Sequence, residues 1–120
     1  MITILGQTPA QKNSKQIFYN KATGKPFITS NNTVKGWQLA ALNQLKQTTE
    51  SYTGAVVIDY MFYVKDNRKR DIDNMIATVN DSLQAGHIIE GDHWQVLQIG
   101  SAKAEIDKEN PRCEITITNI

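Results

Sequence analysis

Residues 55–84 read AVVIDYMFYVKDNRKRDIDNMIATVNDSLQ and contain the strongest structural signal in the chain. Over Ala55–Lys65, apolar side chains occupy every second position, which predicts a long strand with one apolar face and one mixed face. From Ile72 to Leu83, apolar residues recur every three or four positions, which predicts an amphipathic helix over about residues 73–84. A polar, basic loop joins the two. This strand–loop–helix unit anchors the predicted fold.

Shorter elements are expected on both sides of this unit. Because strands and helices do not alternate strictly along the chain, the sheet should be mixed or antiparallel, with two main helices packed on it. We therefore expect an α+β fold, formed as a single domain over residues 1–120. The further elements expected are a strand at Ile2–Ile4, a loose hairpin or extended loop over 16–28, a helix from about Val34 to Gln47 with Ser30, Asn31 and Asn32 as N-cap candidates, strands at Trp94–Ile99 and Cys113–Thr118, and a turn at Asp107–Pro111.

Composition excludes several classes of protein. A chain of 120 residues with 40% hydrophobic and 21% charged residues fits a globular domain and not a disordered tail, a collagen or a coiled coil. No apolar run approaches the roughly 20 residues needed to cross a bilayer, and Met1–Gly6 has no basic or long apolar region typical of a secretory signal. The single cysteine, Cys113, excludes an internal disulfide. We expect a cytoplasmic protein without a membrane partner.

Charge is distributed unevenly along the chain. Residues 1–70 hold ten Lys/Arg and three Asp/Glu, whereas residues 71–120 hold three Lys/Arg and nine Asp/Glu. Such asymmetry hints at nucleic-acid or metal binding. It is more typical of two solvated faces that attract each other across a fold, so charge alone favours that interpretation.

Two aspartates stand where the basic loop meets the predicted helix. If the backbone is still extended at Asp71 and becomes helical near Asp73, both carboxylates can face one point. Helix capping explains one aspartate at this position, but not two directly after three basic residues. Asp92 lies on the glycine-containing turn that follows the helix, where an ordinary turn aspartate is the simpler interpretation.

Converging carboxylates would require a cation or a proton. Two unit charges 4 Å apart repel by about 1 kcal/mol in water and by about 4 kcal/mol at a protein-like dielectric. An oxygen-only ligand set suits Mg²⁺, or Mn²⁺, rather than zinc. Such an ion suits phosphodiester hydrolysis, and Arg68, Lys69 and Arg70 would then bind the phosphates of DNA.

The order of these residues resembles the motif order of a known family. From Arg70 to Val96, the chain resembles the core signature of the RusA family of Holliday-junction resolvases. Members of this family are small phage- and prophage-associated endodeoxyribonucleases. Weaker similarity lies at Lys25 and Ser30 ahead of the Trp37 helix and at Asn110–Arg112. The residues that carry the core similarity are Arg70-Asp71-Ile72-Asp73-Asn74, Asp81-Ser82-Leu83, Ala85-Gly86, Asp92 and Val96.

The resemblance implies a homodimeric, Mg²⁺-dependent nuclease of DNA recombination and repair. It would recognise four-way junctions and nick two strands of like polarity symmetrically, since a two-fold dimer suits a two-fold substrate. Asp71, Asp73 and Asp92 match the three catalytic, metal-binding carboxylates of the family. The candidate DNA-binding residues are Lys12, Lys15, Lys25, Lys65, Arg68, Lys69 and Arg70. The lysines before residue 30 also fit a merely solvated loop.

One departure from the family keeps alternatives open. Family members often carry a lysine four residues after the second aspartate, where this chain has Ala77. Lys69 or Lys65 could partly take over that positive charge. Without such a replacement, the chain could be a junction-binding protein with weak or no catalysis. A third interpretation is a metal-binding interaction module with no role in nucleic-acid binding.

Aromatic and sulfur side chains outside this signature are expected to be structural. Trp37 lies on the apolar stripe of its helix and should be in the core. Trp94 should be in the core or at a dimer interface rather than stacked on a base. Cys113 lies in an alternating strand, which favours packing over a role as a nucleophile.

Overall fold

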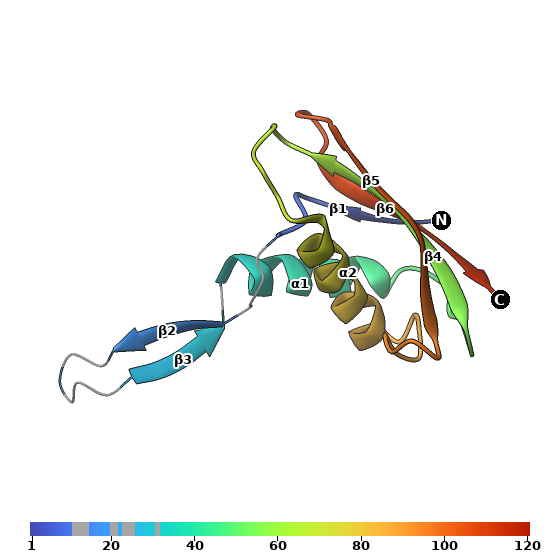
Figure 1. The fold of residues 1–120 in the computed structure, drawn as a ribbon, viewed down its shortest axis with the longest axis horizontal. Helices are drawn as coiled ribbons and strands as arrows, with labels where there is room; N and C mark the ends of the chain where they lie inside the picture. Colours follow the sequence, from blue (N-terminus) through green and yellow to red (C-terminus); the bar gives the residue numbers. More distant parts are fainter. Residues whose placement is uncertain (11–14, 20–21, 23–25, 31) are drawn as a thin grey trace.

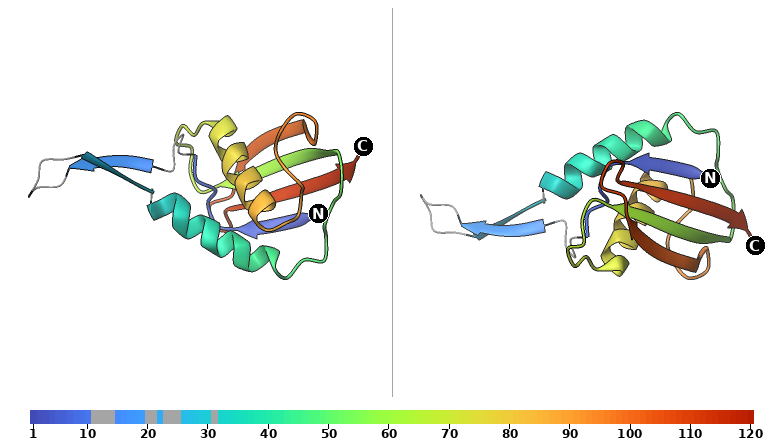
Figure 2. Two further views of the ribbon diagram at one scale, coloured as in Figure 1. Left: turned by 90° about the horizontal axis from the view of Figure 1, so that it is seen from below. Right: turned by 90° about the horizontal axis from the view of Figure 1, so that it is seen from above.

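The body of the molecule is a four-stranded sheet covered on one face by two helices (Figure 1). The strand order is β1 (Ile2–Leu5), β6 (Arg112–Asn119), β4 (Val56–Val64), β5 (Leu97–Ile106). Strand β6 is antiparallel to β1 and β4, whereas β4 and β5 are parallel. Helices α1 (Asn32–Leu45) and α2 (Ile72–Ala85) lie against the same face of the sheet (Figure 2). The mixed sheet and the predicted α+β class are thereby confirmed.

A separate two-stranded sheet projects from this body (Figure 1). It pairs β2 (Lys15–Tyr19) with β3 (Pro26–Ser30) antiparallel, which agrees with the hairpin and not with the extended loop, the two alternatives expected here. The computed structural model describes residues 1–10, 15–19, 22, 26–30 and 32–120. Of the predicted DNA contacts, Lys12 and Lys25 lie outside the described residues, and Lys15 is the first residue of β2. None of the described helices is long and apolar enough to span a membrane.

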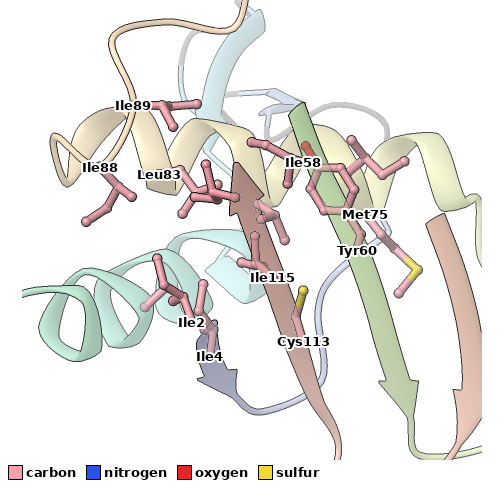
Figure 3. Packing of buried hydrophobic residues seen from close by; sticks show 14 of the residues in the cluster. Ile2, Ile4, Ile58, Tyr60, Met75, Leu83, Ile88, Ile89, Cys113 and Ile115 are labelled. Atoms are coloured by element: carbon pink, nitrogen blue, oxygen red, sulfur yellow. The ribbon is translucent and has the colours of Figure 1, made fainter. Parts of the chain in front are cut away.

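Strand β4 organises the hydrophobic core. Its alternation of buried and half-buried residues matches the apolar and mixed faces predicted from the sequence. Figure 3 shows Ile58, Tyr60 and Ile115 of the sheet on the side that faces Met75 and Leu83 of α2. Trp37 and Cys113 are buried in the same core, as predicted. The buried residues of β4 are Val56, Ile58, Tyr60, Phe62 and Val64.

Helix α2 is the crossover between the parallel strands β4 and β5. A parallel pair needs such a connection, because the chain must return to the starting end of the sheet. The first turn of α2 therefore follows the end of β4, and its last turn precedes the start of β5. Arg70–Asn74 therefore lies at the start of α2, whereas Ala85, Gly86 and Asp92 lie at its end or beyond it.

Strand β5 differs from the prediction and forms an edge of the sheet. The sequence predicted a strand at Trp94–Ile99, whereas β5 begins at Leu97 and continues to Ile106. Gly100 and the small or charged residues 101–105 are weak strand formers. The sequence therefore did not predict the second half of β5. The register with β4 shifts at Gly100, where an added Cβ would lie 2.5 Å from Asp59 Oδ1. A side chain at this position would therefore displace the Asp59 carboxylate.

A buried hydrogen bond fixes α2 on the sheet, and its removal should destabilise the fold. The Tyr60 hydroxyl donates to Asn80 Oδ1, and burial raises the pKa of Tyr60 above its ordinary value. Tyr60→Phe would leave the buried Asn80 oxygen unpaired, so we expect a loss of about 1–3 kcal/mol in the free energy of unfolding. Urea unfolding measures this loss. Tyr63→Phe is the matched control, because it keeps the ring beneath Arg112; equal midpoints for the two variants would contradict the prediction.

Candidate metal and DNA-binding site

Asp71 and Asp73 lie together at the start of α2. Asp71 is the N-cap, with an extended backbone (φ −75°, ψ 113°), and its Oδ1 accepts a hydrogen bond from the Asp73 amide at 3.1 Å. The change from extended to helical backbone therefore occurs where the sequence predicted it. Both side chains are exposed, and the positive end of the helix dipole favours their negative charge.

The charges of these aspartates have no cationic partner among the described residues. The ion pairs of the preceding loop use Asp66 instead, which lies 2.8 Å from Arg70 Nη2 and 3.9 Å from Arg68 Nε. A hydrogen bond from the Arg68 amide is the main reason that the pKa of Asp66 lies below its ordinary value, and Arg70 adds to this effect. The local cations thus neutralise Asp66 and leave the carboxylates of Asp71 and Asp73 available.

Asp92 lies elsewhere on the molecule. It is exposed on the turn between α2 and β5, and its charge is the second cause, after burial, of a raised pKa at Asp81. Asp81 is two helical turns beyond Asp73, which corresponds to about 12 Å along the helix axis. Within residues 1–10, 22 and 33–120, no three His, Cys, Asp or Glu side chains are placed to hold a metal ion. One chain therefore brings Asp71 and Asp73 together, but not Asp92 with them.

The basic residues of the loop surround a hollow of about 430 Å³. Lys65, Arg68, Lys69 and Arg70 all line it. Arg70 is only 14% exposed and is held by the Asp66 carboxylate and by the Asp66 carbonyl oxygen at 3.1 Å. The other three side chains are exposed. The predicted cationic cluster thus lies on the loop that leads into Asp71.

Two further observations differ from, or add to, the sequence prediction. Trp94 is 84% exposed, so of the two places predicted for it the core is excluded, and a dimer interface stays a prediction. It lies on the same turn as Asp92, next to His93, whose Nδ1 is 2.8 Å from Gln95 Oε1. The sequence also gave no indication that Gln7 and Thr8 line the basic hollow. Only the polar character of this stretch was visible in the sequence.

Comparison with known proteins identifies one family. The family model described as endodeoxyribonuclease RusA matches residues 8–118, which is nearly the whole chain. No curated protein matches the chain. The matched range includes Asp71, Asp73 and Asp92 as well as the basic loop.

Proposed function

The chain belongs to the RusA endodeoxyribonuclease family, and we propose that it resolves four-way DNA junctions by paired, symmetric, Mg²⁺-dependent nicks. Membership implies nuclease activity of the Holliday-junction resolvase class. The match over residues 8–118 is the observation that carries this proposal. Recombination and repair of DNA are the processes in which such an activity serves.

The side chains at the start of α2 suit a hard divalent cation. Asp71 and Asp73 offer only carboxylate oxygens, they are exposed, and no described cation pairs with them. Mg²⁺ is commonly bound by one or two carboxylates together with waters and substrate phosphates, and Mn²⁺ accepts similar ligands. Such an ion, when bound, activates water and neutralises the phosphate charge. Asp71 and Asp73 would hold the ion, while Arg68 and Lys69 would bind the adjoining DNA backbone.

Asp92 gives a reason to expect a homodimer. Because no third carboxylate stands with Asp71 and Asp73 to hold a metal within the described residues, a site that uses all three family carboxylates would take Asp92 from a second copy of the chain. A two-fold dimer would then form two equivalent sites, one for each strand of a two-fold junction. The exposed Trp94 beside Asp92 is a large apolar side chain that contact with a second copy would bury.

A junction-binding protein with weak or no catalysis is the second candidate. Two observations favour it: the exposed Ala77 replaces the lysine often found in the family, and a single chain holds no three-carboxylate group within the part that the structure describes. This candidate shares the basic loop and the junction substrate with the first. Only cleavage separates the two.

Incubation of the protein with a synthetic four-way junction and Mg²⁺ tests the proposal. We expect paired nicks at symmetric positions in two strands of like polarity, no nicks when EDTA replaces Mg²⁺, and little cleavage of a linear duplex. Denaturing gels of each end-labelled strand measure these products. Junction binding without nicks would favour the second candidate, and equal cleavage of linear duplex would contradict junction selectivity.

A further inference from the structure

The basic hollow beside the Lys65–Arg70 loop is built from two distant parts of the chain. One wall is the loop, and the other is the Gln7–Ala10 segment that follows β1. Its volume of about 430 Å³ compares with about 30 Å³ for one water, so a hydrated phosphate group fits. The described residues that line it include four cations and no carboxylate. The hollow therefore suits an anion.

One hydrogen bond joins the two walls, and a second orders the Gln7–Ala10 wall itself. Gln7 Oε1 accepts from the Lys65 amide at 2.8 Å, and Gln7 Nε2 donates to the Thr8 carbonyl oxygen at 3.0 Å. Arg70 is fixed against Asp66 on the loop side. The backbone of the two walls is thus already ordered before a ligand enters the hollow, which favours binding.

At this hollow, the hydroxyl of Thr8 and the ammonium groups of two lysines lack partners among the described residues. Thr8 is 1% exposed, and its Oγ1 has no hydrogen-bond partner among the described residues. An unpaired buried hydroxyl destabilises a fold, and such groups in native proteins call for an explanation. Lys65 and Lys69 form no ion pair with any carboxylate in the part of the chain that the structure describes. Thr8, with its unpaired hydroxyl, and two lysines without ion-pair partners therefore line one hollow.

We propose that this hollow holds one backbone phosphate of DNA. Lys65 and Lys69 neutralise the phosphate, and the Thr8 hydroxyl, after rotation about χ1, donates a hydrogen bond to it. The inference rests on the proposed function, because DNA is the ligand that function supplies. It adds the segment after β1 to the DNA-binding surface and places a phosphate contact on the loop that leads into Asp71.

Thr8→Val tests the inference, because it removes the hydroxyl and keeps the shape of the side chain. Binding to a labelled four-way junction and to a labelled linear duplex is measured by fluorescence anisotropy in EDTA, over a series of salt concentrations. We expect about three- to tenfold weaker binding to both DNAs, the effect of one lost hydrogen bond. The salt dependence should stay unchanged because no charge is lost. Lys69→Gln should instead lower the slope of log K against log salt by about 1.

Thermal unfolding separates a ligand contact from a structural role. Because the Thr8 hydroxyl is unpaired in the fold, Thr8→Val should unfold at the same or a higher temperature than the wild type while binding DNA more weakly. Thr116→Val, at an exposed position of β6, is the matched control and should bind as the wild type does. Unchanged affinity of Thr8→Val, or a loss of affinity that follows a loss of stability, would overturn the inference.

Failure of this inference is distinguishable from failure of the proposed function. A phosphate contact acts on any DNA, so the Thr8→Val effect is measurable on linear duplex even if the wild type neither prefers nor cleaves junctions. Conversely, a wild type that nicks junctions and a Thr8→Val variant that binds duplex normally would retain the proposed function and remove the phosphate site.

Discussion

Asp73→Asn should abolish junction cleavage while leaving junction binding intact. The substitution removes a charged ligand of the proposed Mg²⁺ site but keeps the Asp73 amide that bonds to Asp71 Oδ1, so the helix start is preserved. Metal-ion catalysis contributes several kcal/mol to transition-state stabilisation, so we expect the cleavage rate to fall roughly a thousandfold. Single-turnover cleavage and anisotropy measure the two properties separately.

The control for this variant is Glu105→Gln, which removes an exposed carboxylate from β5 and should cleave normally. A loss of binding by Asp73→Asn would point to a structural role instead. Normal cleavage by Asp73→Asn would remove this carboxylate from the catalytic site.

Mixed dimers test whether the site draws on two copies. Asp73→Asn and Asp92→Asn should each be inactive alone. In a mixed dimer, a two-copy site leaves one centre intact, with Asp71 and Asp73 from one copy and Asp92 from the other. We therefore expect the mixture to regain nicking of one strand, without paired nicks. A mixture as inactive as its components would show that each chain builds its own site.

Phe62→Ala should cause the largest loss of stability in the molecule. Phe62 is completely buried in β4, and its ring stacks on Tyr60 with the ring centroids 6.0 Å apart. Truncation of a buried phenylalanine costs about 3–5 kcal/mol, because contacts are lost and a cavity remains. That is a large part of the 5–15 kcal/mol typical of a domain, so much of the variant should be unfolded under mild heating.

Urea and thermal unfolding measure the Phe62→Ala effect. Met61→Ala is the matched control, since Met61 is the half-buried neighbour on the opposite face of β4. We expect it to cost about 1 kcal/mol. If both variants lost the same stability, Phe62 would not hold the central position in the core that its burial indicates.

The parts of the fold that sequence alone predicts are those set by local periodicity. The β4 alternation, the α2 stripe and the extended-to-helical change at Asp71 each depend on neighbouring residues, and all three are present. The extent of β5 was missed because pairing with β4, rather than its own composition, stabilises its second half. The exposure of Trp94 could not be predicted, because a strand pattern does not show where its sheet ends.

In the candidate site, too, the sequence predicts local arrangements but not long-range ones. Asp71 and Asp73 are two residues apart, so local backbone geometry was enough to bring them together. The position of Asp92 depends on the length of α2 and on the course of the following turn, which no local pattern specifies. The hollow depends on a hydrogen bond between Gln7 and Lys65, residues 58 positions apart in the sequence. Such long-range contacts become visible only in the folded chain.

The outer edge of β5 has a consequence for solubility at high concentration. No described strand pairs with this edge, and Ile99 and Ile106 are 50% and 57% exposed near its two ends. Unpaired edges recruit strands of other molecules and start aggregation. Here the irregularity at Gly100 increases the twist of β5. The exposed charge of Lys103 disfavours pairing of another molecule's strand with the middle of β5. We therefore expect the same residues that made β5 hard to recognise to lower the tendency of this edge to pair with other molecules.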